Sequence, residues 1–162
     1  MFVTHLVLSM SMTQAQALTK DDDLLKHLVG KWRITREFPK RPSAQNDCEV
    51  TYEMDGHWLK IAMKDVEKPA KYDAHVYITR MVDTKQYSIH WLDSFGGTLP
   101  ESLGTGTRKG DAIEFLWKDQ DGDLRNTFTW HPKDKTWTSL IDQKGKEGQW
   151  TVFCTDTYRP AK

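Results

Sequence analysis

The sequence lacks an excess of charge of either sign, and it lacks any long hydrophobic run. Lys and Arg together number 23, and Asp and Glu also number 23, so the formal net charge is zero. No basic stripe follows the chain, and binding to the phosphates of nucleic acid is therefore not expected. The apolar tract at residues 2–10 is too short for an integral membrane span, which needs about 20 residues. These features favour a single globular domain over residues 18–162.

Cysteine is also scarce, because Cys48 and Cys154 are the only two. Neither belongs to a Cys and His pattern typical of a zinc site, so no metal and no cofactor is predicted. The strand order proposed below places one strand between the two cysteines, which separates them by about 9–10 Å. That separation favours two separate thiols, although a strand end that bends inward would still allow a disulfide.

The N-terminus carries the signal for targeting. Residues 2–10 resemble the apolar region of a signal peptide, and Ala15-Gln16-Ala17 has the small-x-small form of a cleavage site. No Lys or Arg precedes the apolar region, which weakens the match to such a leader. We predict a signal peptide over residues 1–17 and a periplasmic or secreted protein. The alternative is a disordered N-terminal extension on a cytoplasmic protein.

Helical periodicity is nearly absent, and most of the chain alternates between apolar and polar residues. Only residues 22–28 indicate a short helix or turn, with Asp21 or Asp22 as its cap. Apolar side chains then recur at every second position, as at Ile113, Phe115 and Trp117, and turn residues separate the segments. The pattern predicts strands over residues 31–38, 47–54, 59–64, 72–82, 87–93, 102–108, 113–117, 124–130, 137–141 and 150–159.

These strands, with no long helix between them, predict an all-β fold: a single antiparallel up-and-down β-barrel of about ten strands. Parallel neighbours would need crossover connections of about a dozen residues, and the sequence offers none. Each strand is expected to pair with the next, and the last strand to close the barrel against the first. Asp55-Gly56 is a two-residue hairpin signal of the kind that joins such neighbours.

Two motifs near the ends of the chain resemble the calycins, the superfamily of antiparallel barrels that includes lipocalins and fatty-acid-binding proteins. Gly30-Lys31-Trp32 matches the Gly-x-Trp of the first calycin strand, and Arg159 matches an arginine on the last strand. The resemblance implies that Gly30, Trp32 and Arg159 close one end of the barrel, with Arg159 packed over the Trp32 indole as a cation–π contact. It also implies an interior cavity.

A closer resemblance is to a bacterial family of uncharacterised lipocalin-like domains, and it covers residues 24–160. It rests on an ordered set of motifs: Leu28-Val29-Gly30-Lys31-Trp32, Tyr72-Asp73, Trp91-Leu92-Asp93-Ser94 and Thr157-Tyr158-Arg159. The family implies no established activity. Haem-binding barrel relatives use a His ligand, but their surrounding motif matches none of the six His residues here.

The alternation selects candidate ligand-binding residues for the cavity. If Trp32 points into the barrel, Arg36 does so too, where it would meet a ligand carboxylate or an internal Asp or Glu. A bulge that turns Arg36 out to solvent is the alternative. Asp93 would either anchor a ligand at the barrel mouth or cap its loop. His75 and His90 have the opposite parity and are expected in solvent.

Aromatic residues on the inward parity complete the candidate set, and simple core packing is the alternative for all of them. They are Tyr52, Tyr87, Trp91, Phe115, Trp117, Phe128, Trp130 and Trp150.

The sequence therefore predicts a lipocalin-like protein that binds a small apolar or amphipathic ligand, with or without an acidic head. One alternative is a low-turnover enzyme acting on such a ligand, although no nucleophile and base pair is distinguished. The other is a filled barrel that serves as a structural or partner-binding domain. The sequence makes no prediction of oligomeric state.

Overall fold

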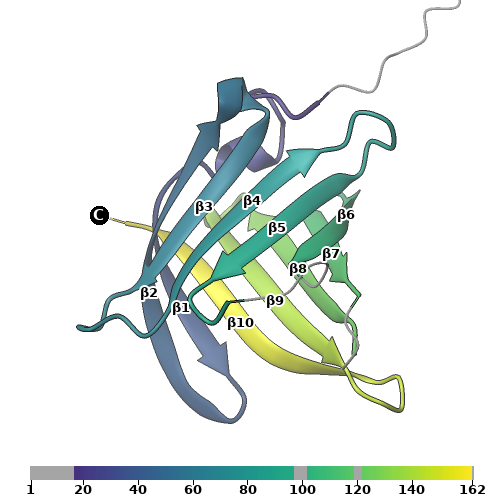
Figure 1. Cartoon of the computed structure of the whole chain (residues 1–162). Coiled ribbons are helices and arrows are strands. Elements are labelled where there is room, and N and C mark those ends of the chain that lie inside the picture. The colour runs from purple at the N-terminus through teal and green to yellow at the C-terminus, as the bar shows by residue number, and fades with distance from the viewer. Residues whose placement is uncertain (1–16, 97–101, 119–121, 162) are drawn as a thin grey trace, which may run out of the picture.

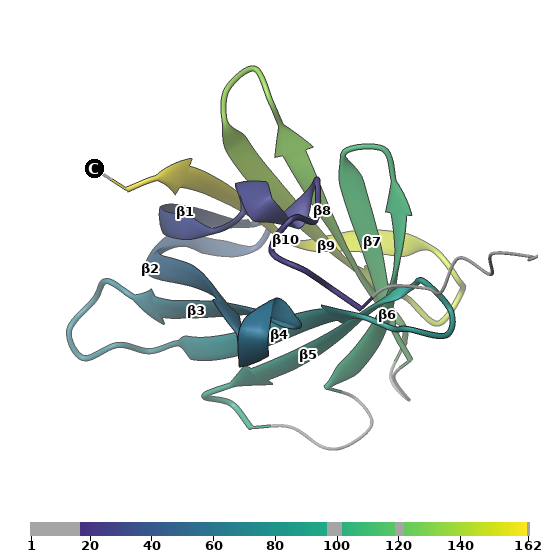
Figure 2. The ribbon, with the colours of Figure 1, turned by 90° about the horizontal axis from the view of Figure 1, so that it is seen from above.

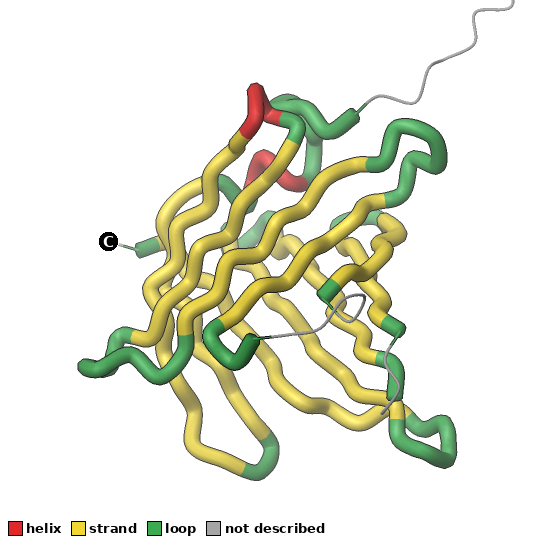
Figure 3. The backbone as a smooth tube through the Cα atoms, viewed as in Figure 1, coloured by secondary structure: helices red, strands yellow, loops and turns green. Residues whose placement is uncertain are grey.

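The computed structural model describes residues 17–96, 102–118 and 122–161, which form one closed antiparallel barrel (Figure 1). Each strand pairs with its neighbour in sequence, and the last pairs with the first. The strands are β1 (Gly30–Phe38), β2 (Arg41–Glu53), β3 (Trp58–Asp65), β4 (Asp73–Arg80), β5 (Tyr87–Asp93), β6 (Leu103–Lys109), β7 (Ala112–Trp117), β8 (Leu124–His131), β9 (Thr136–Lys144) and β10 (Trp150–Pro160). Figure 3 shows that strands make up most of the described backbone. The all-β, single antiparallel up-and-down barrel predicted from the sequence is confirmed.

Alternation within each strand sets the two faces of the barrel wall. On β1, Trp32, Ile34 and Arg36 are buried, while Lys31 and Arg33 are exposed. A slip of one residue in the pairing would exchange these two sets, so burial of one face specifies the register.

β6 carries glycine at two inward positions because aromatic rings of β7 press against its backbone. A Cβ atom at Gly106 would lie 2.5 Å from the ring of Phe115, and one at Gly104 would lie 2.8 Å from the indole of Trp117. The glycine-rich sequence of this strand is therefore a packing requirement.

An N-terminal segment, residues 17–29, crosses one end of the barrel, which we call the covered end (Figure 2). Its helix is a single 3-10 turn, η1 (Leu25–His27), rather than anything longer. Asp22 is the capping residue, because its Oδ1 accepts hydrogen bonds from the amides of Leu24 and Leu25. The leucines of the segment are buried, and Trp137 Nε1 donates to the carbonyl of His27 at 3.2 Å.

The main differences from the predicted elements lie at the start of β2 and at the turn that follows it. β2 starts at Arg41 rather than at residue 47, because Pro42 lies where the β1–β2 hairpin overhangs the sheet, and pairing with β3 begins only at Asn46. A proline is tolerated at such an edge position. At Asp55 and Gly56 the chain forms a 3-10 turn, η2 (Met54–Gly56), instead of a two-residue hairpin.

The tract that suggested a signal peptide, residues 1–17, falls outside the described residues except for Ala17. Within the described ranges, no helix has the length and hydrophobicity to cross a membrane.

Candidate functional site

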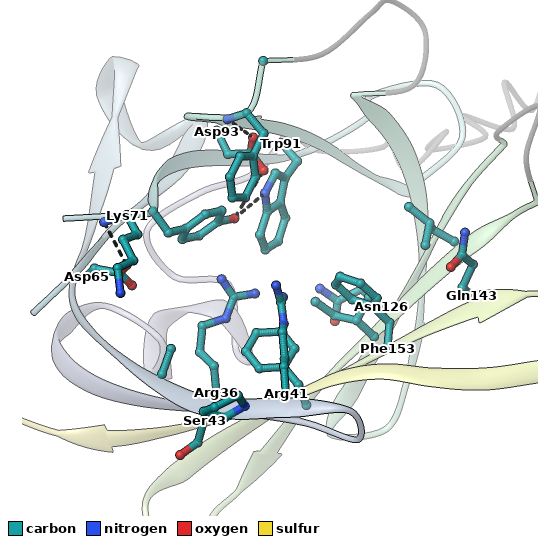
Figure 4. Close-up of a pocket in the computed structure, with 18 of the residues that line it drawn as sticks. Arg36, Arg41, Ser43, Asp65, Lys71, Trp91, Asp93, Asn126, Gln143 and Phe153 are labelled. Carbon is teal, nitrogen blue, oxygen red and sulfur yellow. Dashed lines mark hydrogen bonds between the residues drawn. The ribbon is translucent and has the colours of Figure 1, made fainter. Parts of the chain in front are cut away.

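The interior of the barrel divides into a packed half and a hollow half. Toward the covered end, apolar side chains fill the space, and the bulkiest are Trp137, Tyr158, Phe115 and Phe128, all fully buried. Toward the opposite, open end lies a cavity of about 720 Å³. Small-molecule sites typically measure about 300–1,000 Å³. Figure 4 shows the lining of this cavity, to which strands on several sides of the barrel contribute.

Arg36 reaches the cavity from β1 and is paired with Asp156 of β10. The two residues are direct partners in the strand register, and Arg36 Nε donates to Asp156 Oδ1 at 2.9 Å. Their side chains are 8% and 0% exposed. Burial raises the pKa of Asp156 above its ordinary value, and the Arg36 guanidinium opposes that shift. Of the alternatives drawn from the sequence, an internal carboxylate is the partner that the structure shows.

The terminal nitrogens of Arg36 point into the cavity, as Figure 4 shows. The guanidinium carbon lies 4.7 Å from the centroid of the Tyr72 ring, which is a cation–π contact. Arg36 is therefore held from one side by a carboxylate and from another by an aromatic face, with part of its hydrogen-bonding capacity directed at the cavity.

Tyr72 and Trp91 form an aromatic wall whose position is fixed by hydrogen bonds. Trp91 Nε1 donates to Tyr72 OH at 3.1 Å, and Tyr72 OH donates to Asp93 Oδ2 at 3.4 Å. Asp93 Oδ1 accepts from the amide of Phe95 at 2.9 Å, so Asp93 caps its loop. Asp93 also lines the cavity. The two interpretations of Asp93 drawn from the sequence are therefore compatible.

Asn126 of β8 lines the base of the cavity, and its side-chain nitrogen has no partner among the described residues. Its Oδ1 accepts a hydrogen bond from Ser139 Oγ at 2.8 Å, which turns Nδ2 toward the cavity (Figure 4). The residue is 1% exposed, and Nδ2 has no hydrogen-bond partner among the described residues. Ser139 is the register partner of Asp156, which in turn is the partner of Arg36. Asn126, Ser139, Asp156 and Arg36 thus form a polar row across β8, β9, β10 and β1.

Charged side chains also surround the open rim of the cavity. The Arg41 guanidinium carbon lies 3.6 Å from the centroid of the Phe38 ring. In the part of the chain that the structure describes, Arg41 has no carboxylate within ion-pair distance. Lys71 pairs with Glu67 at 2.7 Å, and its amide donates to Asp65 Oδ2 at 3.1 Å. Among the described residues, therefore, Arg41 is a rim cation without a carboxylate partner.

The structure brings four of the predicted residues to the cavity: Arg36, Trp91, Asp93 and Trp117. The other aromatic candidates lie elsewhere, which corrects their expected position. Phe115 and Phe128 belong to the packed core. The reason is that alternation reveals which side of the sheet a residue faces, but not how far along the barrel it lies.

The remaining candidates lie at the covered end or on the outer surface. Tyr87 OH donates to Asp22 Oδ2 at 3.0 Å. Tyr52 is near the same carboxylate, and burial raises its pKa to about 12. Trp130 stacks on His27 with ring centroids 4.9 Å apart. Trp150 lies beneath the guanidinium of Arg125, at 4.4 Å, rather than in the cavity.

The expected contact between Arg159 and Trp32 does not form. Trp32 is buried and its Nε1 donates to the carbonyl of Leu28 at 2.6 Å. Arg159 is exposed, because its register partner on β1 is Arg33, which also faces outward. No cation–π contact of the described residues joins Arg159 to Trp32. The N-terminal segment closes this end instead, and the φ of 138° at Gly30 lets it turn into β1.

Sequence reasoning missed several residues that shape the cavity. Asn126 shares its parity with Phe128 and Trp130, so a polar residue at an inward position was the available signal. Asp156 alternates with Tyr158 in the same way, and the predicted pairing of the last strand with the first would have placed it near Arg36. Arg41 fell in a segment that was expected to be a loop.

Histidines and cysteines do not form a reactive centre among the described residues. His75 is exposed, as expected, whereas His90 is half-buried and lies 3.0 Å from Ser102 Oγ. No three His, Cys, Asp or Glu side chains in the described ranges are arranged to hold a metal ion. Cys48 and Cys154 are separate buried thiols, as predicted, and burial raises the pKa of each to about 12. Both therefore stay protonated at neutral pH.

Comparison with known proteins supports the fold and little more. No protein-family model matches the sequence, and no curated protein matches it significantly. The barrel is similar to the S-type phycobiliprotein lyase CPES from Guillardia theta, with a TM-score of 0.59 and 11% identity over 86% of this chain and 92% of the lyase. Rv2717c from M. tuberculosis matches with a TM-score of 0.49 and 13% identity over 90% of this chain and 99% of that one. At such low identity, the likeness to the lyase concerns the fold alone.

Proposed function

We propose that this protein reversibly binds a small, largely apolar ligand with an acidic head in the open half of its barrel. One observation carries the proposal: aromatic rings and arginine guanidinium groups face the same cavity of about 720 Å³ (Figure 4). Ligand pockets are typically apolar with a few polar groups that orient the ligand.

The apolar part of the lining supplies the driving force for binding. Tyr72, Trp91, Trp117 and Phe153 all line the cavity. Each 100 Å² of apolar ligand surface that they remove from water contributes about 2.5 kcal/mol before the costs of association. A ligand without substantial apolar surface would not gain from such a lining.

A fluorescence assay with a matched pair of variants tests this function. Ile141 lines the cavity on β9, whereas Leu140, one position earlier, faces outward. Ile141→Trp should fill the cavity, and Leu140→Trp should leave it open. We expect anilinonaphthalene sulfonate and cis-parinaric acid to bind the wild type and Leu140→Trp alike. We expect Ile141→Trp to weaken the binding of both probes by about tenfold or more, which is equivalent to about 1.4 kcal/mol.

Equal affinity in both variants would show that the probes bind outside the barrel. The absence of binding to the wild type would reject a carrier of apolar ligands and favour a structural role. Circular dichroism of all three proteins controls for loss of the fold.

We further propose that the protein acts outside the cytoplasm, because residues 2–10 and Ala15-Gln16-Ala17 resemble the apolar region and the cleavage site of a signal peptide. A native mass spectrum of protein purified from fractionated cells tests this proposal. We expect a chain that begins at Leu18 in the periplasmic or secreted fraction. A chain that retains Met1 in the cytoplasmic fraction would refute export, and any bound ligand would appear as added mass in either case.

A further inference from the structure

The polar row at the base of the cavity contains buried atoms that no described residue satisfies, Asn126 Nδ2 and Asp156 Oδ2. Asn126 Nδ2 has no hydrogen-bond partner among the described residues, although its side chain is almost completely buried. The terminal nitrogens of Arg36 face the same space (Figure 4). An unpaired buried donor costs about 1–3 kcal/mol. Because Ser139 already holds the other end of the Asn126 amide, the partner of Nδ2 is to be sought inside the cavity.

We propose that Arg36 and Asn126 form a head-group subsite that holds a carboxylate at the base of the cavity. The ligand then lies head-first, with its apolar body directed toward the open end. This inference rests on the proposed function and adds to it the chemical class, position and orientation of the head group.

The donors present select a carboxylate over a neutral polar group. Arg36 and Asn126 both offer N–H groups to the cavity, and a carboxylate is a planar group that only accepts. Hydrogen bonds between a guanidinium and a carboxylate are about twice as strong as neutral ones. Asp156 compensates the charge of Arg36, and Arg41, which lines the same cavity from the rim, adds a second positive charge to it.

The base of the cavity suits the charged head better than the rim does. At the rim, the Arg41 guanidinium lies against the Phe38 ring, and Lys71 is already paired with Glu67 through side chains that are 77% and 60% exposed. Exposed ion pairs contribute only about 0–1 kcal/mol because water screens them. The rim also presents aromatic side chains, since Phe95 is 77% and Phe153 46% exposed and both line the cavity. Such rings suit an apolar tail.

Comparison of an acid with its methyl ester tests the subsite. We expect the wild type to bind cis-parinaric acid at least about tenfold more tightly than its methyl ester, a difference of about 1.4 kcal/mol. Asn126→Asp is nearly isosteric and replaces the donor with a carboxylate, so it should abolish the preference for the acid while binding of the ester remains. Gln45→Glu makes the same amide-to-acid change on the outer face of β2, where Gln45 is exposed, and should keep the preference.

A measurement on the wild type avoids dependence on the fold of a variant. Carboxyl-labelled palmitic acid bound in the proposed subsite should show a carboxyl carbon resonance that does not titrate near the ordinary carboxyl pKa, about 4–5. The side-chain amide resonances of Asn126 should shift on binding. A carboxyl resonance that titrates as in water would place the head at the rim and overturn the subsite.

The outcomes separate this inference from the function on which it rests. Equal binding of acid and ester by the wild type would reject the carboxylate subsite and leave an apolar-ligand carrier. Binding of neither compound would reject the function itself.

Discussion

Replacing Arg36 with methionine tests the buried ion pair that positions the cavity base. Methionine keeps a long unbranched side chain and removes the charge. Asp156 would remain buried, since its side chain is 0% exposed. Among the described residues, its remaining side-chain hydrogen-bond partner would be Cys154, whose Sγ donates to Asp156 Oδ1 at 3.1 Å. Removal of one member of a buried pair typically lowers the free energy of unfolding by about 3–5 kcal/mol. We expect Arg36→Met to lower the free energy of unfolding by an amount in this range at neutral pH.

The loss of stability should depend on pH, because Asp156 can take up a proton. Burial already raises its pKa in the folded protein, and loss of Arg36 removes the group that opposes the shift. A carboxyl with a higher pKa in the folded state binds more protons when folded than when unfolded. The charge-dependent part of the destabilisation, measured against the wild type, is therefore absent at low pH, where Asp156 is protonated in both folded proteins. It grows by up to about 1.4 kcal/mol per pH unit as the pH rises from the folded-state pKa of Asp156 in the wild type toward its higher folded-state pKa in the variant.

Urea unfolding followed by tryptophan fluorescence, at about pH 5 and about pH 8, measures this effect. Arg33→Met is the control, because Arg33 lies on the same strand but pairs with Asp47 on the exposed face, and its loss should cost less than about 1 kcal/mol. The double variant Arg36→Met/Asp156→Leu leaves no unpaired charge and should recover most of the stability. The reasoning would be refuted if Arg36→Met lowered the free energy of unfolding equally at both pH values and the double variant recovered no stability.

Further predictions concern packing, capping and the thiols. Gly106→Ala places a Cβ atom 2.5 Å from the ring of Phe115 and should lower the free energy of unfolding by about 1–3 kcal/mol in urea titrations; an unchanged midpoint would contradict this packing. Asp22→Ala removes the cap of the N-terminal segment and should lower the free energy of unfolding by about 1 kcal/mol in the same assay, whereas an unchanged value would show that the cap does not stabilise the covered end. Because burial raises the pKa of Cys48 and Cys154 to about 12, Ellman's reagent should modify them only after unfolding, whereas rapid modification of the native protein would show that they are accessible.

Local sequence patterns were sufficient to predict the strands, because the formation of a strand depends largely on residues that are neighbours in the chain. The alternation at Ile113, Phe115 and Trp117 predicts a wall strand whatever the rest of the protein does, and β7 is found there. The meander and its closure follow from short connections, which leave each strand little choice of partner. Pro42 misled the prediction of where β2 begins. Proline interrupts pairing inside a sheet, but it is tolerated where β2 overhangs the sheet, before its pairing with β3 begins.

The site was predicted less completely, since it depends on depth along the barrel and on contacts between distant residues. Parity placed both Trp117 and Phe115 inside, but only Trp117 reaches the cavity, because the covered half is filled by core side chains. Arg36 was identified as an inward arginine, and the sequence left open whether an internal acid or a ligand would meet it. The orientation of the Asn126 amide depends on Ser139 of the neighbouring strand, which no local pattern specifies.

The sequence by itself thus determined the strands, their order and the face that each side chain presents, because backbone geometry imposes a period of two. Only the tertiary structure decided that Arg36 meets Asp156, 120 positions away along the chain. It also decided that Arg159 faces outward and that the cavity occupies the end opposite to the N-terminal segment. These features arise from closure of the barrel, which sets the relative heights of its strands and so determines which inward side chains touch and which leave space between them.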